Sequence, residues 1–455
     1  MEVFGSSGVR GIVGAELTPE FVGAIVAAAG SELAADTIAI GRDTRTTGPL
    51  LADAAASHLA AIGCTVHRLG IVPTPGIQAY AEANEIPAVI ITASHNPPEY
   101  NGIKLIGPDG IELPIETLEA IEDRYQANSI QYVTYDAVGQ SVQIDSVCKT
   151  YRAQVLDAFP DAQQAAIADA NLTVALDPGH GAGSFTSPKV LRELGVQVIT
   201  VNNDPDGTFP GRNPEPTEQT LSDLSRLVRT SAADMGIAHD GDADRAIFID
   251  ETGTVISGEA SLAALAAATI AAGDTVVSAV NVSQRLADVV DAKQATLELT
   301  PIGSTYLISR IRDLTAAGER VSIAGEGNGG IMFPAYRIAR DGAYTMLQFL
   351  HLITEEPASS VVAPYDDYFN ARVNLRYDTL DERDTMLQAA ETFVESADVE
   401  YTTIDGYRLE YGDAWVLVRP SGTEPLVRIY AEARSHARAQ ELVETVESAV
   451  AIDSA

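Results

Sequence analysis

The residues best suited to chemistry lie in the segment 92–97, which reads Thr-Ala-Ser-His-Asn-Pro and follows the apolar run 88–91. An α/β protein displays its reactive side chains in such loops, where a short buried strand ends. Ser94 stands beside His95, as in some hydrolases, but the Gly-x-Ser-x-Gly pattern of a nucleophile elbow is absent. The segment instead predicts a serine that carries phosphate. His95 either takes part in the catalysis or orients the loop by hydrogen bonding.

Three aspartates form a second group, in the sequence Asp-Gly-Asp-Ala-Asp-Arg at Asp240, Asp242 and Asp244. In an extended segment, side chains two residues apart point to the same side. Three converging carboxylates predict an oxygen site for a hard divalent ion, with Mg²⁺ preferred where phosphate is also a ligand. An EF-hand is excluded, because Glu251 at its closing position follows a strand-like run. A metal here would neutralise charge during phosphoryl transfer, and Arg245 follows at once.

Other loops offer further groups for binding phosphate and sugar. Lys104 is one of only four lysines, and we expect a point charge or proton carrier that arginine cannot replace. The glycine-rich segment 325–330 carries Glu326 and Asn328, which suit sugar hydroxyls. A turn near the C-terminus joins hydroxyls, a glycine and guanidinium groups, which together clasp a phosphate dianion. Its residues are Arg419, Ser421, Gly422, Thr423 and, further on, Arg428.

The charge and the cysteine content indicate which ligands and which surroundings suit the protein. The net charge of -35 is scattered along 455 residues, which suits a solvent of high salt, although an acidic surface also suits a basic partner. Nucleic acid is not an expected ligand, because its phosphates require a basic surface. Two cysteines give neither a disulfide framework nor a metal motif. We expect a cytoplasmic protein, monomer or homodimer, with no signal peptide and no membrane span.

The order of apolar runs predicts three α/β segments followed by an α+β segment. We expect domains at 1–145, 146–252, 253–362 and 363–455, with linkers near 131–146, 250–258 and 355–364. The predicted strands are 37–41, 65–69, 88–91, 172–176, 196–201, 235–238, 275–278, 296–299, 321–324, 369–375, 406–411, 414–419 and 426–433. The predicted helices are 50–62, 74–83, 187–194, 218–230, 260–272, 283–290, 380–394, 436–450 and one from 304.

These loops, in this order, resemble those of the α-D-phosphohexomutase superfamily, which includes phosphoglucomutase, phosphomannomutase and phosphoglucosamine mutase. The resemblance covers essentially the whole chain and includes the segments 4–11, 41–45 and 210–216. It implies four domains around a central cleft, three of them similar α/β domains and the last a C-terminal α+β domain. It also implies that hexose 6-phosphate and hexose 1-phosphate are interconverted through a phosphoserine and a 1,6-bisphosphate, which also serves as the activator.

The resemblance assigns a role to each candidate residue. Ser94 would be the phosphoserine, and it would complete the coordination of one Mg²⁺ with the three aspartates. Positively charged side chains would assist proton transfer and stabilise charge: Arg10, Lys104 and Arg245. Glu326 would hold the sugar hydroxyls, and the turn from Arg419 to Arg428 would grip the phosphate that does not react.

One departure from the common bacterial pattern lies in the glycine-rich segment, where Gly330 stands at the position of the family's histidine. This variant resembles archaeal members, and with the acidic composition it indicates a salt-loving archaeon. Glucosamine phosphate is the expected substrate, with mannose or glucose phosphate as alternatives. A phosphatase or sugar-phosphate sensor on the same scaffold is a further alternative, and so is a structural protein that binds partners through its acidic face. All the phosphate-suited loops are present, which favours the mutase.

Overall fold

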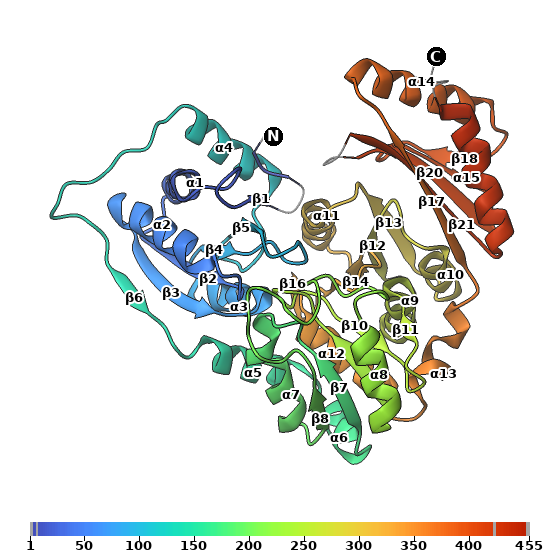
Figure 1. Ribbon diagram of the computed structural model, residues 1–455, viewed down its shortest axis with the longest axis horizontal. Helices are drawn as coiled ribbons and strands as arrows, with labels where there is room; N and C mark the ends of the chain where they lie inside the picture. The colour runs from blue at the N-terminus through green and yellow to red at the C-terminus, as the bar shows by residue number, and fades with distance from the viewer. Residues whose placement is uncertain (1–2, 6–7, 422–424, 452–455) are drawn as a thin grey trace. The chain divides into compact units, whose positions relative to one another are not determined.

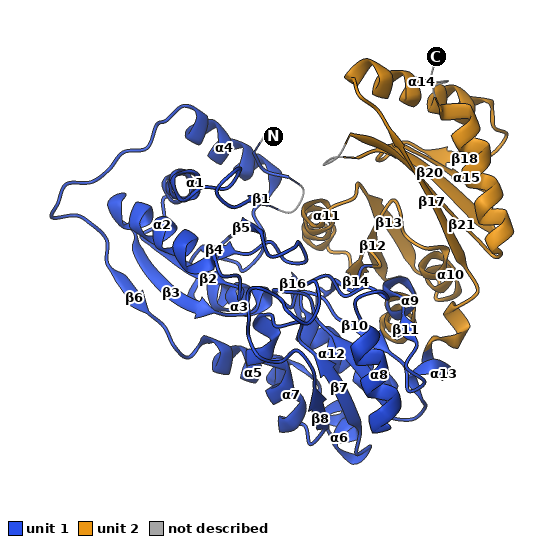
Figure 2. Ribbon diagram, in the orientation of Figure 1, with its two compact units in different colours: residues 1–261, 328–361 blue, residues 262–327, 362–455 orange. Residues whose placement is uncertain are grey.

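A computed structural model of the chain describes residues 3–5, 8–421 and 425–451, and its helices and strands are labelled in Figure 1. The chain forms two compact units (Figure 2). Unit 1 contains Met1–Ser261 and Asn328–Val361, and unit 2 contains Leu262–Gly327 and Val362–Ala455. Both units combine helices with sheets, as the periodicity of the sequence predicts.

The first sheet of unit 1 has the strand order β1-β5-β4-β2-β3-β6. Strands β2, β3 and β4 run parallel, and β5 runs antiparallel to its neighbours β4 and β1. The strands are β1 Val9–Ile12, β2 Thr37–Arg42, β3 Thr65–Ile71, β4 Ala88–Ile91, β5 Tyr100–Ile106 and β6 Ser141–Gln143. The helices are α1 Pro19–Glu32, α2 Gly48–Ala61, α3 Thr74–Asn84 and α4 Ile115–Gln126. The strands and helices predicted between residues 37 and 91 are confirmed.

The second sheet of unit 1 has the order β11-β10-β9-β7-β8, with β7 parallel to both β8 and β9. Its strands are β7 Thr173–Asp177, β8 Gln197–Thr200, β9 Met235–Ala238, β10 Ile247–Ile249 and β11 Val255–Ile256. The accompanying helices are α5 Val147–Ala158, α6 Asp161–Asp169, η1 Ala182–Phe185, α7 Ser187–Glu193 and α8 Ser222–Ser231. The helix predicted at 218–230 begins only at Ser222. Before it, the Thr220 hydroxyl donates to the carbonyl of Glu215 at 2.8 Å, a local contact that competes with helix formation.

Unit 1 also contains the segment that returns after residue 328. It forms the antiparallel pair β15 Ile331–Phe333 and β16 Arg337–Arg340, followed by α12 Gly342–Leu352 and α13 Ala358–Val362. Helix α12 begins at an aspartate cap, because Asp341 accepts a hydrogen bond from the Tyr344 amide. The sequence predicted neither this strand pair nor α12.

In unit 2, β12 runs parallel to β13 and β14. These strands are β12 Thr275–Ala279, β13 Thr296–Thr300 and β14 Val321–Gly325. The helices of this part are α9 Gly258–Thr269, α10 Gln284–Ala292 and α11 Ser304–Ala316. Every helix and strand predicted between residues 260 and 324 is confirmed to within a few residues.

The C-terminal part of unit 2 is an antiparallel sheet of order β17-β21-β20-β19-β18 with two helices. The elements are η2 Ala363–Tyr365, β17 Phe369–Arg376, α14 Leu380–Ser396, β18 Glu400–Thr402, β19 Tyr407–Glu410, β20 Ala414–Pro420, β21 Leu426–Ala433 and α15 His436–Val450. A tight turn joins β19 to β20, between the predicted strands 406–411 and 414–419, with Gly412 at a φ of +86°. This part is the predicted α+β segment.

Cys64 and Cys148 are both free thiols. None of the helices within the described residues has the length and apolar character needed to cross a membrane.

Candidate active site

Ser94 lies in the loop that follows β4, in a strained and tightly held backbone. Its φ is +49°, a left-handed conformation that a residue with a side chain adopts at some cost. The Arg45 guanidinium donates to the Ser94 carbonyl at 2.9 Å, and the Ser94 amide donates to the Thr92 hydroxyl at 2.8 Å. Thr92 in turn donates to Asp43 at 2.6 Å, and Asp43 forms a buried ion pair with Arg45. These contacts fix the backbone of Ser94 on both sides, and therefore the direction of its side chain.

The Ser94 hydroxyl faces the aspartate cluster. It donates to Asp240 Oδ2 at 2.7 Å, and it lies 3.2 Å from His95 Nδ1. Ser94 is fully buried, and so is the carboxylate that it contacts. The structure therefore brings together the two motifs that the sequence placed 146 residues apart.

The three aspartates converge, but not for the reason the sequence indicated. The segment after β9 is a turn and not an extended strand: the Ala243 amide donates to the Asp240 carbonyl at 3.2 Å, and Ala243 has a φ of +56°. One carboxylate oxygen from each of Asp240, Asp242 and Asp244 lies within 4.8 Å of the others. The expectation of an extended segment was wrong, because the turn itself gathers the carboxylates.

The donor set of this cluster fits a hard divalent cation. Asp242 Oδ1 and Asp244 Oδ1 are buried and accept no hydrogen bond from any described residue. An unpaired buried carboxylate oxygen is costly, and a bound ion would satisfy it. Oxygen-only ligands are those that Mg²⁺ prefers. Asp240, Asp242 and Asp244 are thus the residues that would hold the metal.

Lys104 approaches the same cluster from the neighbouring strand. It stands opposite Ile90 in the pairing of β5 with β4. Its Nζ lies 3.0 Å from Asp242 Oδ2 and 3.0 Å from Asp244 Oδ2, with the side chain only 3 % exposed. Burial alone would lower the pKa of Lys104, but the two carboxylates outweigh it and raise the pKa. In this state Lys104 is an ammonium ion.

The carboxylates themselves differ in proton affinity. Burial, and then the nearby Asp242 and Asp244, raise the pKa of Asp240 well above its usual range. Burial would also raise the pKa of Asp244, but Arg340, Lys104 and Arg245 hold it far below the usual range. The nearby cations therefore favour the ionised form of Asp244, while burial beside two other carboxylates favours the protonated form of Asp240.

Arg245 and Arg10 are tied to the serine loop. Arg245 Nη2 lies 3.0 Å from His95 Nδ1, and Arg10 Nη1 donates to Asn96 Oδ1 at 3.0 Å. Because a guanidinium only donates, His95 Nδ1 is the acceptor and its proton is on Nε2. Burial, together with the positive charge of Arg245, lowers the pKa of His95 to about 2. His95 is therefore neutral, and it orients Arg245 against the loop.

The candidate residues of unit 2 form a separate set. Glu326 Oε1 accepts a hydrogen bond from the Gly303 amide at 2.9 Å. Arg419 and Arg428 stand opposite each other in the pairing of β20 with β21, and Arg419 forms an ion pair with Asp405 at 3.0 Å. Like charges at directly opposite positions of neighbouring strands are unfavourable, so this pair of arginines favours an anion. Ser421 follows β20, whereas Gly422 and Thr423 lie outside the described residues.

Asn328 belongs to unit 1, where it shapes its own turn. Its side-chain Oδ1 accepts a hydrogen bond from the Gly330 amide at 3.0 Å. This contact gives Asn328 a role in the backbone of the glycine-rich segment, and its role toward a sugar stays a prediction.

Two residues of the cluster escaped the sequence analysis. The Thr74 hydroxyl donates to Asp242 Oδ2 at 2.7 Å from the start of α3. Arg340 Nη2 lies 2.8 Å from Asp244 Oδ2, at the end of β16. Neither stands in a recognisable motif, although the sequence Arg-Asp-Gly at 340–342 offers a charged pair before a helix start.

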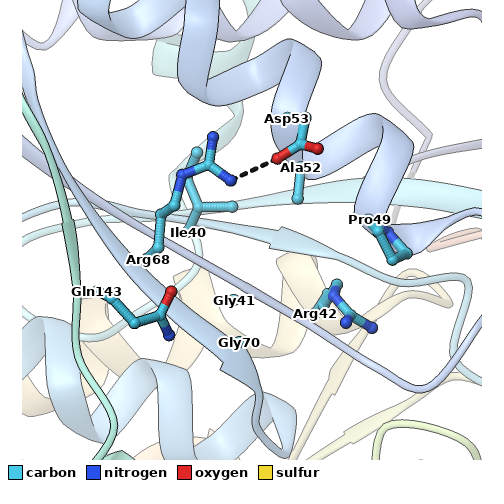
Figure 3. A pocket seen from close by; sticks show the side chains of 9 residues that line it. All are labelled: Ile40, Gly41, Arg42, Pro49, Ala52, Asp53, Arg68, Gly70 and Gln143. Carbon is cyan, nitrogen blue, oxygen red and sulfur yellow. Dashed lines mark hydrogen bonds and ion pairs between the residues drawn. The ribbon is translucent and has the colours of Figure 1, made fainter.

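A pocket that lies on the first sheet of unit 1 is shown in Figure 3. It has a volume of about 180 Å³ and is lined from β2, α2, β3 and β6, with Arg42, Arg68 and Asp53 as its charged residues. Arg68 and Asp53 form an ion pair (Figure 3). The pocket shares no residue with the aspartate cluster.

A buried serine in contact with one of three clustered carboxylates, with cations around them, is an arrangement suited to phosphoryl transfer. Four family models match the chain in succession: phosphoglucomutase/phosphomannomutase α/β/α domain I at 1–131, domain II at 149–253, domain III at 257–368 and the C-terminal domain at 373–449. The chain therefore belongs to the phosphoglucomutase/phosphomannomutase family, and the protein is a phosphohexomutase, an isomerase.

Similar proteins come from archaea and bacteria. A phosphoglucomutase/phosphomannomutase of Thermococcus kodakarensis is 36% identical over 453 residues and covers 97% of both chains. A phosphoglucosamine/phosphogalactosamine mutase of Sulfurisphaera tokodaii is 35% identical over 461 residues and covers 99% of both. The crystal structure of a family protein from Burkholderia thailandensis has the same fold, with a TM-score of 0.84, 24% identity, and coverage of 98% of this chain and 97% of that one.

Proposed function

We propose that the protein interconverts glucosamine 6-phosphate and glucosamine 1-phosphate through a phosphoserine at Ser94. The observation that carries the proposal is the contact between the Ser94 hydroxyl and Asp240, beside oxygens of Asp242 and Asp244 that accept no hydrogen bond from a described residue. A serine in this position would hold a transferable phosphoryl group next to the metal ligands. The activity would require Mg²⁺ and a trace of hexose 1,6-bisphosphate.

The proposed transfer needs no redox partner. A sugar hydroxyl attacks the phosphorus of phosphoserine, the bond from phosphorus to Ser94 Oγ breaks, and that oxygen takes the bonding electrons. The proton lost by the sugar hydroxyl ends on Ser94 Oγ, and Lys104 is the proposed relay. Arg10 and Arg245 would stabilise the charge of the transferring group, as guanidinium groups do in phosphoryl transfer. Mg²⁺, when bound, would neutralise charge on the phosphoryl oxygens.

The bisphosphate so formed must then return its other phosphoryl group to Ser94. A phosphate grip that is independent of the serine would hold whichever end is not reacting. We assign this grip to Arg419, Ser421, Gly422, Thr423 and Arg428, and the contact with sugar hydroxyls to Glu326 and Asn328. The cross-strand position of Arg419 and Arg428 supports the assignment.

The choice of glucosamine phosphate is supported by the name of the Sulfurisphaera tokodaii relative. Glucose or mannose phosphate is the second candidate, supported by the name of the Thermococcus kodakarensis relative. A sensor that binds sugar phosphate without turnover is disfavoured by the presence of the serine and of all three aspartates. The acidic composition supports work in a salt-rich medium.

A substrate panel tests this proposal. Purified protein in KCl, with Mg²⁺ and a trace of hexose 1,6-bisphosphate, would receive glucosamine 6-phosphate, glucose 1-phosphate or mannose 1-phosphate. Isomerisation would be followed by ³¹P NMR. We expect glucosamine 6-phosphate to give the highest kcat/KM. Preference for a neutral hexose would move the assignment to the second candidate, and no turnover with intact Mg²⁺ binding would favour the sensor.

A further inference from the structure

Arg340 reaches the aspartate cluster from a distant part of the chain. Its Nη2 lies 2.8 Å from Asp244 Oδ2, and the side chain is only 7 % exposed. Lys104 Nζ approaches the same oxygen at 3.0 Å. Asp244 Oδ2 thus takes two cations, while its Oδ1 accepts no hydrogen bond from a described residue. Lys104 and Arg340 therefore hold Oδ2 of Asp244, whereas Oδ1 has only the more distant Arg245 Nε, at 3.8 Å, and can accept a ligand.

Gly330 provides the space through which Arg340 passes. A Cβ atom at position 330 would lie 2.6 Å from Arg340 Cδ and 3.1 Å from Asn328 Oδ1. The first distance is shorter than van der Waals contact permits, so any side chain at this position would push the arginine away. The turn cannot move aside easily, because Asn328 Oδ1 accepts from the Gly330 amide. The observed position of the Arg340 side chain therefore depends on the lack of a side chain at Gly330.

The backbone that presents Arg340 is fixed against the metal-binding turn. The next residue, Asp341, accepts hydrogen bonds from the hydroxyls of Tyr151 at 2.7 Å and Tyr336 at 3.0 Å. The Gly342 amide donates to the carbonyl of Ala243 at 3.2 Å, within the turn itself. The arginine is thus held at its base as well as at its guanidinium group.

The charges around the aspartates indicate what Arg340 contributes. The three buried carboxylates face three cations in direct range, Lys104, Arg245 and Arg340. Without Arg340, Asp244 would lose the cation that lies nearest to it, at 2.8 Å, and keep only Lys104 at 3.0 Å and Arg245 at 3.8 Å; weakening the pairing of a buried charge is costly. The planar guanidinium also fixes the direction of the carboxylate better than an ammonium ion would.

We propose that Arg340 is a positioning residue of the metal site, which holds Asp244 Oδ2 and stands in as a counter-ion when no metal is bound, and that Gly330 is required to admit it. The proposal rests on the proposed function in its assignment of the aspartates to Mg²⁺. Arg340 acts through Asp244, so its loss should change how strongly the folded protein depends on the metal.

Thermal unfolding with EDTA and with saturating MgCl₂ tests the proposal. In Arg340→Met the metal-free melting temperature should fall by roughly 5 °C or more, as expected for breaking a buried ion pair. Mg²⁺ should recover most of this loss, because it neutralises the carboxylate left behind. The stabilisation by Mg²⁺ should therefore be larger in the variant than in the wild type. In turnover, kcat should fall about 10–100-fold with KM for the hexose phosphate nearly unchanged.

Companion variants separate this role from general packing. Arg340→Lys keeps the charge and should retain a Mg²⁺ shift close to that of the wild type. Gly330→Ala should behave like Arg340→Met, and the two changes together should cost little more than either alone. Arg285→Met is the matched control, because Arg285 is an equally buried arginine that pairs with the buried Glu432 in unit 2. It should lower the melting temperature equally with and without Mg²⁺.

An unchanged Mg²⁺ shift in Arg340→Met, or a shift equal to that of Arg285→Met, would overturn the proposal. Additive effects of Gly330→Ala and Arg340→Met would overturn the part that concerns Gly330. The melting temperatures do not depend on turnover. A wild type without mutase activity but with a normal Mg²⁺ shift would refute the proposed function and leave the role of Arg340 testable.

Discussion

At the scale of single residues, the site is organised by what each carboxylate oxygen contacts. Asp242 Oδ2 accepts from Thr74 and Lys104, while Asp242 Oδ1 is buried without a hydrogen bond from a described residue. In the same way, Asp244 Oδ2 accepts from Lys104, while Asp244 Oδ1 is buried without a hydrogen bond from a described residue. The protein's own donors occupy one oxygen of each residue, which leaves the other for a cation. The arrangement is therefore prepared for a metal before one binds.

Asp242→Asn tests this division at one residue. An amide cannot supply the charge of a carboxylate, so Mg²⁺ affinity should fall by at least ~10-fold. Isothermal titration with MgCl₂ would measure it, and circular dichroism would verify that the variant is folded. Asp145→Asn, on a loop outside the cluster, is the matched control. Equal Mg²⁺ affinity in wild type and Asp242→Asn would place the metal elsewhere.

Sequence spacing predicted the local part of the site and missed the distant part. Ser94, Asp240, Asp242, Asp244 and Lys104 stand in short segments whose residue types indicate their chemistry, and the structure gathers them. Thr74 and Arg340 carry no local signal, because their role arises from packing between segments far apart in the chain. The cause of convergence was also misjudged, since a turn and not an extended strand brings the aspartates together.

At the scale of elements, Asp341 joins three parts of unit 1. It caps α12, and it accepts hydrogen bonds from Tyr151 on α5 and from Tyr336 just before β16. A carboxylate is costly to bury without such hydrogen-bond donors. Asp341 directly follows Arg340 in the chain. The contacts that hold α5, α12 and the start of β16 together therefore also fix the backbone from which Arg340 reaches the aspartate cluster.

Tyr151→Phe should lower the free energy of unfolding by about 1–3 kcal/mol, because it removes one buried donor from a charged acceptor. The midpoint of urea unfolding would report the change. Tyr135→Phe serves as control, because Tyr135 is 94% exposed. Similar midpoints for the two variants would show that the Asp341 contacts contribute little.

Helix α5 also carries a thiol with an altered pKa. Burial raises the pKa of Cys148 to about 11, and Lys189 and Arg152 only partly oppose this. Since the folded value exceeds the unfolded one, the neutral thiol stabilises the fold below the unfolded pKa, and this contribution is lost as pH rises towards 11. Alkylation of native Cys148 should be slow at pH 8 and accelerate about tenfold per pH unit above it. Peptide mass spectrometry would follow it, and alkylation at pH 8 as fast as in urea would contradict the assignment.

The elements differ in how well the sequence predicted them. Strands such as β4 and β9 are short, apolar and bounded by loops, and both match their predicted bounds. Helix α1 was missed although Thr18 caps it and Pro19 begins it, because its many alanines and glycines blur the amphipathic pattern. Strand β5, which carries Lys104, was missed because its burial depends on pairing with both β4 and β1.

At the scale of the whole molecule, charge is the dominant property. The net charge of -35 is spread over the sequence, with 64 acidic residues against 29 lysines and arginines. Like charges on one molecule repel each other. Salt largely screens this repulsion between exposed charges that are further apart than about 10 Å at 0.1 M salt, or about 3 Å at 1 M salt. From this composition we expect salt to favour the folded state.

We expect the melting temperature to rise by at least ~10 °C between low salt and molar KCl, because screening removes self-repulsion in the compact state. Differential scanning calorimetry would measure it. The same titration in NaCl at equal ionic strength separates screening, which both salts share, from the binding of one cation. A melting temperature that does not change with salt would favour an acidic surface that docks a basic partner.

The most direct test of the account is whether Ser94 carries the phosphoryl group. Wild-type protein and Ser94→Ala would be incubated with Mg²⁺ and hexose 1,6-bisphosphate, then measured by intact and peptide mass spectrometry alongside turnover. We predict one phosphoryl group on the peptide that contains Ser94, none in the variant, and a rate at least ~10³-fold lower in the variant. Ser57→Ala, on the surface of α2, should behave as the wild type. Phosphorylation at another residue, or turnover in Ser94→Ala near that of the wild type, would contradict the mechanism.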